Sequence, residues 1–124
     1  MSDGYDPQKS RIAEDRLADF LRAPLTGDLL EVPGIGSAAI SKLASGDEED
    51  RVTNTYQLIG KFLILKRNSE ENEEELMECS AHCDAFWHWL KSKQITAYRS
   101  GIVMAIAEKV NTMLPGIYDA ADFN

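Results

Sequence analysis

The sequence predicts an all-α fold in a single domain, and three observations support this. Apolar residues recur three and four positions apart in several segments, which is the spacing of one face of a helix. Pro24, Gly46 and Pro115 divide the chain into segments of helical length. The short apolar run 62–65 would suit a strand, but no other segment offers a partner strand. A chain of 124 residues is also long enough for a hydrophobic core of its own.

The beginning of the chain predicts an arm followed by a helix. Residues 1–10 are polar and contain glycine and proline, so we expect a flexible N-terminal arm. Residues 11–22 are expected to form the first helix, because its apolar side chains lie on one side: Ile12, Leu17, Phe20 and Leu21. Pro24 ends this helix, since proline disfavours the helical conformation in the residue before it.

Two short helical limbs are expected over residues 27–32 and 37–45, joined by a glycine turn. Gly34 and Gly36 permit positive φ angles and a close approach of the backbone. Ile35 stands between them and is expected to hold the turn against the core. This pattern is typical of a helix-hairpin-helix motif, whose hairpin amides bind one phosphate of a nucleic acid backbone.

The second limb of this hairpin carries the features of an anion site. Ser37 stands at the N-cap or in the first turn, so the amides of the turn and of the limb point the same way. These amides would form a small cradle for an anion, with Lys42 further along the same limb. The alternative is a glycine turn between two packed helices that binds no ligand.

The formal net charge of −8 argues against a nucleic acid partner, but its distribution weakens that objection. Residues 47–50 hold four acids and residues 70–78 hold six. Without these ten, eleven acids remain against thirteen Lys and Arg, so the rest of the chain is mildly basic. Screening acts over roughly 8 to 10 Å at moderate salt, so a local patch can act despite the overall sign. We expect 47–50 to be a solvated loop and 68–75 an acidic linker.

Three further helices are expected, over residues 55–66, 76–93 and 96–114. The first is the most apolar, and its broad apolar surface suggests burial against both the core and another subunit. The inward residues are expected to be Leu58, Ile59, Phe62 and Leu63 in the first, Leu76, Cys79, Cys83, Phe86 and Leu90 in the second, and Tyr98, Ile102, Ile106, Val110 and Met113 in the third. Thr96 is the expected N-cap of the last helix, and the tail after it either docks or frays.

Cysteine and histidine residues gather in one of these helices. Cys79, His82 and Cys83 fall at i, i+3 and i+4, with His88 nearby, and thiolate plus imidazole suits zinc. A structural zinc site normally has four ligands, often from two segments, and the chain has no second such cluster. The two cysteines also lie on the core stripe, which favours buried, unligated thiols and predicts no metal or cofactor.

Other classes of protein fit the sequence poorly. A Cys-His nucleophilic pair needs a third group to orient the base, and none is evident, so we expect no enzymatic activity. Two cysteines are too few for a disulfide framework, which favours a reducing, intracellular compartment. No stretch approaches the length of a membrane span, and we expect no signal peptide.

Three segments together resemble the barrier-to-autointegration factor family, small all-helical proteins of animal cells. Gly34-Ile35-Gly36, followed by a helix that ends at Lys42-Leu43, resembles the hairpin of that family in register. Residues 56–66, Tyr-Gln-Leu-Ile-Gly-Lys-Phe-Leu-Ile-Leu-Lys, are similar to its central helix nearly residue for residue. Phe86, Trp89 and Leu90 resemble the end of its fourth helix.

The resemblance implies a compact five-helix domain over residues 11–114 that contains a helix-hairpin-helix motif. The acidic segments 46–51 and 68–78 would then be insertions, and 115–124 a C-terminal tail. It further implies a homodimer, nuclear and associated with chromatin, that binds double-stranded DNA without sequence preference and bridges two duplexes. Carried over to this chain, the DNA-binding positions are Gly34, Ile35, Gly36, Ser37 and Lys42, and the dimer contacts are Phe62 and Leu65.

The chain departs from the family at several charged positions. Only Lys9 and Arg11 correspond loosely to the basic N-terminal residues of the family, and Lys42 follows Ser41 where the family has a second lysine. The electrostatic part of DNA affinity should be weaker, since each neutralised phosphate releases about one counterion. The alternative is an acidic, dimeric protein-interaction module with the same fold that has lost DNA binding.

Overall fold

The structure is a computed structural model that describes residues 4–66 and 78–123. Within these residues it contains five α-helices, four short 3₁₀ helices and no strand, which confirms the predicted all-α class. The α-helices are α1 (Glu14–Arg22), α2 (Ser37–Leu43), α3 (Thr55–Ile64), α4 (Cys79–Ser92) and α5 (Arg99–Met113). The 3₁₀ helices are η1 (Pro7–Lys9), η2 (Leu29–Glu31), η3 (Glu48–Asp50) and η4 (Ala120–Phe123). In the described part of the chain, no helix has both the length and the apolar character needed to cross a bilayer.

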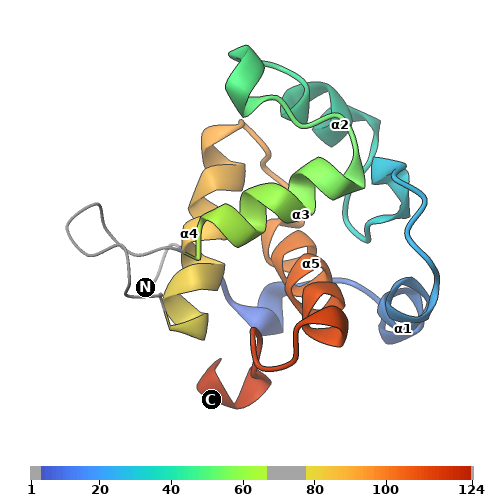
Figure 1. Ribbon diagram of the computed structural model, residues 1–124, viewed down its shortest axis with the longest axis vertical. Coiled ribbons are helices and arrows are strands. Elements are labelled where there is room, and N and C mark those ends of the chain that lie inside the picture. The colour runs from blue at the N-terminus through green and yellow to red at the C-terminus, as the bar shows by residue number, and fades with distance from the viewer. Residues whose placement is uncertain (1–3, 67–77, 124) are drawn as a thin grey trace.

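Helix α5 lies at the centre of the fold, and α1, α3 and α4 pack around it (Figure 1). Because neighbours cover it on several sides, buried residues occupy most of its circumference. The predicted inward residues Ile102, Ile106 and Val110 are fully buried, whereas Tyr98 and Met113 are about half exposed. Tyr98 is the N-cap of this helix and Met113 is its last residue.

Helix α1 is joined to α5 by a buried lysine. The Lys109 Nζ donates to the carbonyl oxygens of Phe20 (2.9 Å), Leu21 (3.1 Å) and Ala23 (2.6 Å). These carbonyls close α1, where a helix leaves its last acceptors without internal donors. A cation at this end also suits the helix dipole.

The first helix begins later than the sequence predicts. Helix α1 starts at Glu14, whereas residue 11 was the expected beginning. Arg11 has a φ of 59°, which is left-handed and cannot belong to an α-helix. The segment before α1 therefore turns away from the helix axis.

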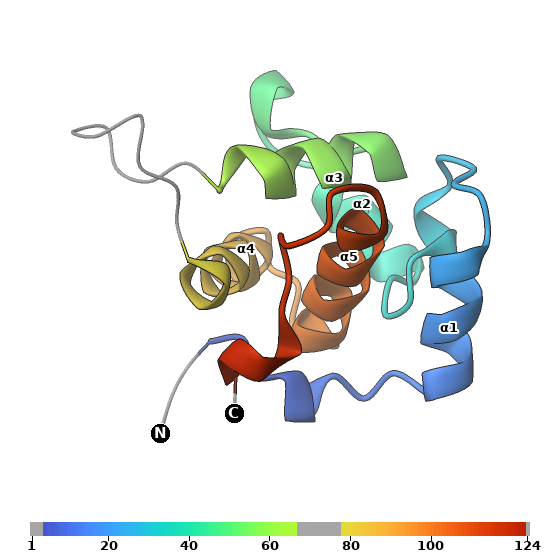
Figure 2. The ribbon, with the colours of Figure 1, turned by 60° about the horizontal axis from the view of Figure 1, so that its bottom comes forward.

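Residues 4–10 do not form the flexible arm that the sequence predicts. The Tyr5 amide donates to Asp84 Oδ1 at 3.0 Å, and the Asp6 amide donates to Ser100 Oγ at 3.1 Å. These bonds hold the arm against α4 and α5, near the C-terminal segment (Figure 2). A sequence that is polar throughout is thus ordered by partners roughly 80 to 95 positions away.

The tail docks, which was one of the two outcomes expected for it. The hydroxyls of Tyr5 and Tyr118 lie 2.8 Å apart, and the Phe123 ring packs edge-on against the Tyr5 ring at 5.0 Å. Asn111 Oδ1 accepts hydrogen bonds from the amides of Gly116 and Tyr118, which turns the chain back after α5. The two ends of the chain therefore hold each other in place.

Helix α4 follows the predicted core stripe closely. Cys79, Cys83, Phe86 and Leu90 are all buried. Residues 68–77 of the expected acidic insertion 68–78, residue 76 among them, lie outside the described residues, so the helix is described from Cys79 onward.

Candidate nucleic-acid interface

The expected hairpin begins with a tight turn. The Ile35 amide donates to the Val32 carbonyl at 3.1 Å, and Gly34 has a φ of +94°. With Pro33 in the second position and a positive φ in the third, this is a type II turn. The first limb is only the 3₁₀ turn η2, shorter than expected, and Ile35 is buried as the sequence predicts.

Gly34 is required by packing as well as by its backbone angle. A Cβ at this position would lie 3.0 Å from Ile102 Cγ1 and 3.1 Å from Tyr98 Cβ. The turn therefore rests directly on the beginning of α5.

The start of α2 is open to solvent. Gly36 is its N-cap, with extended backbone, and no side chain caps the helix. Gly36, Ser37 and Ala38 are exposed, and a Cβ at Gly36 would meet nothing within 4 Å. The first amides of a helix have no internal acceptor, so these groups are available to an anion. Ser37 is the first helical residue and does not cap the helix.

Two adjoining hollows lie beside this hairpin, and together we call them the groove. The smaller, of about 220 Å³, is lined by the hairpin and the α4–α5 connection: Gly34, Gly36, Ala38, Ala39, Lys42 and residues 95–98. The larger, of about 570 Å³, is lined by the N-terminal arm and the start of α5: Gly4, Lys9, Arg11, Trp87 and residues 96–100. Residues 96–98 belong to both hollows and separate them.

The charge of the groove is opposite to that of the chain. Four basic side chains line it: Lys9, Arg11, Lys42 and Arg99. Among the residues that the structure describes, no Asp or Glu lines either hollow, although the chain has a net charge of −8. The arrangement suits an extended anionic ligand that spans both hollows.

None of the family models, curated proteins or solved structures compared with the chain matches it. A function for this protein must therefore be inferred from the residues that line the groove.

The sequence does not indicate that Arg99 is a groove residue, nor that Lys9 and Arg11 lie beside it. Arg99 was expected inside a helix that starts at Thr96, but it is the first residue of α5. Its Nη1 donates to the Ile95 carbonyl at 2.7 Å, and its guanidinium lies 4.4 Å from the centroid of a Trp87 ring. Lys9 and Arg11 reach the same hollow because the arm packs on α5. The N-terminal arm, the hairpin and the start of α5 are far apart in the chain, so no pattern among neighbouring residues predicts that they form one groove.

Two groove residues also have unusual backbone angles. Of the described non-glycine residues, three have positive φ: Arg11, Gln94 and Tyr98. Gln94 follows the C-cap of α4. The Ile95 amide donates to the Leu90 carbonyl, which is the Schellman motif, and this motif accounts for the left-handed conformation of Gln94. No such motif accounts for Arg11 and Tyr98, and such angles gather at functional sites.

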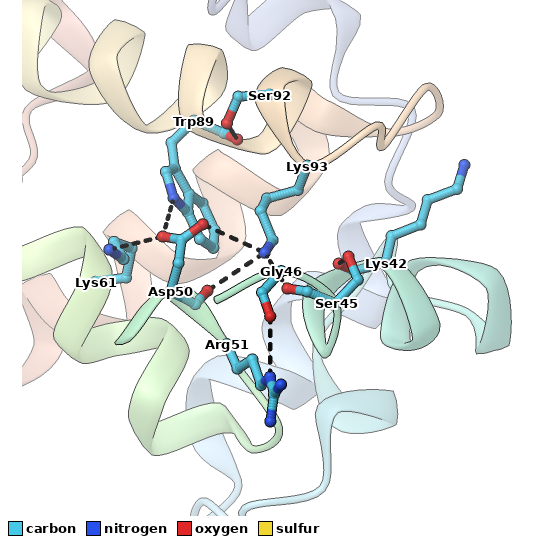
Figure 3. A network of polar contacts seen from close by, with 9 residues as sticks. All are labelled: Lys42, Ser45, Gly46, Asp50, Arg51, Lys61, Trp89, Ser92 and Lys93. Carbon is cyan, nitrogen blue, oxygen red and sulfur yellow. Dashed lines mark hydrogen bonds and ion pairs between the residues drawn. The ribbon is translucent and has the colours of Figure 1, made fainter. Parts of the chain in front are cut away.

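The acidic segment next to α2 is anchored by its last residue, while its first three acids are exposed to solvent. Asp50 Oδ1 accepts hydrogen bonds from Trp89 Nε1 and Lys61 Nζ, both at 3.2 Å, and Lys93 Nζ lies 3.3 Å from Oδ2 (Figure 3). Burial raises the pKa of Asp50, but these hydrogen bonds outweigh it and hold the pKa below its usual value. The expected solvated loop is thus the 3₁₀ helix η3, tied to α3 and α4. Lys42 points away from this network in Figure 3.

A second carboxylate near the hairpin is also used within the fold. Glu31 accepts hydrogen bonds from the amides of Thr26 (2.9 Å) and Gly27 (3.0 Å), and from Thr55 Oγ1 (2.7 Å). Burial raises the pKa of Glu31, but the bonds from Thr55 and the two amides hold it below its usual value. This carboxylate joins the first limb to α3 and does not line the groove.

The two expected dimer contacts lie in different surroundings. Phe62 is fully buried within a single chain, where it stacks on His82, so its side chain offers no surface to a partner. Leu65 is half buried, and its neighbour Ile64 is 65% exposed. The exposed apolar surface at this end of α3 therefore belongs to Ile64 and Leu65.

Both cysteines of α4 and one of its two histidines belong to the core. Cys79 and Cys83 are buried, as the core stripe predicts, and burial raises the pKa of the Cys83 thiol well above its usual range. His82 is buried and its Nε2 lies 2.6 Å from the Phe62 carbonyl oxygen, whereas His88 is exposed beside Asp84. In the described ranges, no three such side chains are grouped to hold a metal ion.

Proposed function

We propose that this protein binds double-stranded DNA through the sugar-phosphate backbone, without sequence preference and without catalysis. The observation that supports this most is the separation of basic side chains, which line the groove, from the described acidic side chains, which lie elsewhere. Four cations line the groove of an acidic chain, and no described carboxylate lines it with them. A polymer with regularly spaced phosphates is the natural ligand for such an extended cationic surface.

The hairpin supplies the second part of the proposal. Exposed amides at the start of α2 and the side chain of Lys42 lie at one end of the groove. A phosphate there would accept hydrogen bonds from the amides of Gly36 and Ser37 and gain the charge of Lys42. Lys9, Arg11 and Arg99 would then neutralise phosphates further along the backbone.

The lack of sequence preference follows from the side chains available. Base edges are read by long polar side chains on an element that enters the major groove. Helix α2 has seven residues, a length of roughly 10 Å, and begins with Ser37, Ala38 and Ala39. These short side chains allow close approach to the backbone but reach no base edge.

We also propose that the protein is a homodimer that bridges two duplexes in nuclear chromatin. The exposed apolar end of α3, at Ile64 and Leu65, is the surface that supports self-association. A two-fold axis there would give the dimer two grooves. Light scattering tests this part: a monomer at all concentrations would rule out bridging.

The test of DNA binding is a salt titration with charge-reversal variants. A fluorescent 30-base-pair duplex of random sequence is titrated with the parent, Gly36→Glu and Lys42→Glu by anisotropy. Four phosphate contacts predict a slope of about −3.6 for log K against log salt. We expect each variant to bind at least about tenfold more weakly, because a charge-assisted contact contributes about 1.5–3 kcal/mol.

Matched controls separate the groove from the overall charge. Ala81→Glu repeats the charge change of Gly36→Glu on an exposed residue of α4, and Arg22→Glu repeats that of Lys42→Glu at the exposed end of α1. Neither residue lines the groove. No parent binding at low salt, or equal losses in variants and controls, would defeat the proposal.

A second candidate is an acidic protein-interaction module with the same fold. The observation that favours it is the segment 47–50, where Asp47, Glu48 and Glu49 are exposed and Asp50 bonds to α3 and α4. Such a module would bind a basic peptide and lose it on Glu48→Gln and Glu49→Gln. In the DNA-binding protein, the same changes would leave DNA affinity equal or higher.

A further inference from the structure

Tyr98 occupies an unusual place in the groove. It lies on the segment that lines both hollows, and its side chain is 47% exposed. Its Cβ stands 3.1 Å from the position of a Cβ built on Gly34, directly beside the hairpin. Among the described residues, its hydroxyl has no hydrogen-bond partner.

Neither the backbone nor the core explains a tyrosine at this position. Tyr98 has φ 61° and ψ 22°, a left-handed conformation that glycine or asparagine adopts at lower cost. It is the N-cap of α5, where Ser, Thr, Asp or Asn would accept a hydrogen bond, and its side chain caps nothing. Its exposure excludes a core role. A tyrosine here therefore costs stability, through its left-handed backbone and the missing N-cap hydrogen bond. Residues with such a cost are found at functional sites, so we infer that the ring contacts a ligand.

We propose that the Tyr98 ring stacks on a DNA base that has left the duplex, so that the groove prefers DNA with an unpaired end over closed duplex. This inference rests on the proposed DNA binding. It adds a specificity-determining residue and a substrate class to the same site.

The shape of the groove favours an unpaired base over a contact with the duplex surface. A closed duplex keeps its bases stacked inside, so it presents base edges and the sugar-phosphate backbone but no base face on which a ring could stack. The hollow on the far side of Tyr98 measures about 570 Å³ and has Lys9, Arg11 and Arg99 on its walls. A splayed nucleotide can enter it, with its base on the ring and its phosphate near these cations. Base–aromatic stacking of this kind tolerates any sequence.

The other aromatic residue of that hollow is not available as a platform. Trp87 is only 6% exposed. The Arg99 guanidinium lies 4.4 Å from one of its ring centroids and the Lys91 ammonium lies 5.6 Å away. Tyr98, at 47% exposed, is thus the more accessible aromatic side chain of the groove.

The test compares three DNA ligands with the same duplex sequence. One is a dumbbell closed at both ends by polyethylene-glycol linkers, which carry no bases, and one carries a four-nucleotide 3′ overhang. The third has 2-aminopurine as the first unpaired base of that overhang, whose fluorescence falls on stacking. We expect the parent to bind the overhang about fivefold more tightly than the dumbbell, or more, and to quench 2-aminopurine.

Two variants separate the ring from the backbone and the hydroxyl. Tyr98→Asn keeps a residue that suits the left-handed angle, so it should melt at the same temperature as the parent or higher. It should bind both ligands equally and leave 2-aminopurine bright. Tyr98→Phe keeps the ring and should behave as the parent does.

The outcomes also separate this inference from the proposed function. Equal binding of overhang and dumbbell by the parent, or a preference that survives in Tyr98→Asn, would overturn the role of Tyr98 alone. A preference lost in Tyr98→Phe would overturn stacking in favour of a hydroxyl contact. Overhang binding without dumbbell binding would overturn the duplex proposal but support the inference, and no binding of either ligand would overturn both.

Discussion

The Nε2 atom of His82 lies 2.6 Å from the carbonyl oxygen of Phe62. Phe62 is in the last turn of α3, where a helix leaves carbonyl groups without internal donors. The acceptor implies that Nε2 carries the proton, while Nδ1 is buried without a partner among the described residues. The two rings also stack, with centroids 3.9 Å apart. A neutral histidine thus joins α3 to α4.

This contact predicts a loss of stability in mild acid. Burial lowers the pKa of His82 below its usual 6.5, and the hydrogen bond to Phe62 opposes this only in part. Below pH 6.5 the unfolded chain therefore takes up a proton before the folded chain does. The stability present above pH 6.5 is lost as the pH falls toward the folded pKa. Urea denaturation at pH 7, 6 and 5 measures this slope.

The second histidine provides the control for that slope. The chain has two histidines, and His88 is exposed. His82→Gln should flatten the dependence between pH 7 and 5, and His88→Gln should retain it. An equal slope in His82→Gln and the parent would show that His82 is not the titrating group.

Lys109→Met should destabilise the fold by about 2–4 kcal/mol, because three carbonyl oxygens at the end of α1 would lose their donor. Methionine has a similar length, so little of the loss would come from a cavity. The free energy of unfolding from urea titration measures the effect. Arg22→Met, an exposed cation at the same end of α1, should change it by less than about 0.5 kcal/mol.

Gly34→Ala and Gly36→Ala should differ sharply in stability. Alanine at position 34 would need a φ near +94° and would crowd Ile102, so we expect a loss of about 1–3 kcal/mol. Alanine at position 36 has ordinary angles and free space, so stability should change by less than about 1 kcal/mol. Similar melting temperatures for the two variants would contradict this reading of the turn.

Tyr118→Phe should loosen the N-terminal arm. The change removes the 2.8 Å hydrogen bond to the Tyr5 hydroxyl, at a cost of about 1 kcal/mol. Burial raises the pKa of Tyr118 to about 12, so both hydroxyls are neutral at pH 7. Hydrogen exchange should quicken at the amides of Tyr5 and Asp6, which bond to Asp84 and Ser100. Unchanged exchange at both amides would show that the tail does not hold the arm.

Helical segments could be predicted from the sequence because they depend on neighbours three and four positions apart. The stripe of Cys79, Cys83, Phe86 and Leu90 is buried as its spacing predicts, and Ile35 is buried in the turn. The ends of the helices were predicted less accurately. Helix α5 starts at Arg99 rather than Thr96, because Tyr98 adopts a left-handed angle that no local pattern indicates.

The placement of charged side chains could not be predicted, because it depends on contacts between distant segments. Asp50 belongs to an acidic segment that the sequence predicts to be a solvated loop. In the structure its carboxylate bonds to Lys61 of α3 and to Trp89 and Lys93 at the end of α4. The arm reads as flexible, yet Asp84 and Ser100 hold its amides.

The sequence by itself determined the all-α class, the core stripe of α4 and the glycine turn, since each of these follows from residues close together in the chain. Only the tertiary structure decided that Lys9, Arg11, Lys42 and Arg99 share one groove, and that Phe62, predicted both as an inward residue and as a dimer contact, belongs to the core alone. The physical reason is that periodicity reports which side of a helix is apolar. It does not report which segments pack against that side or which charges their packing brings together.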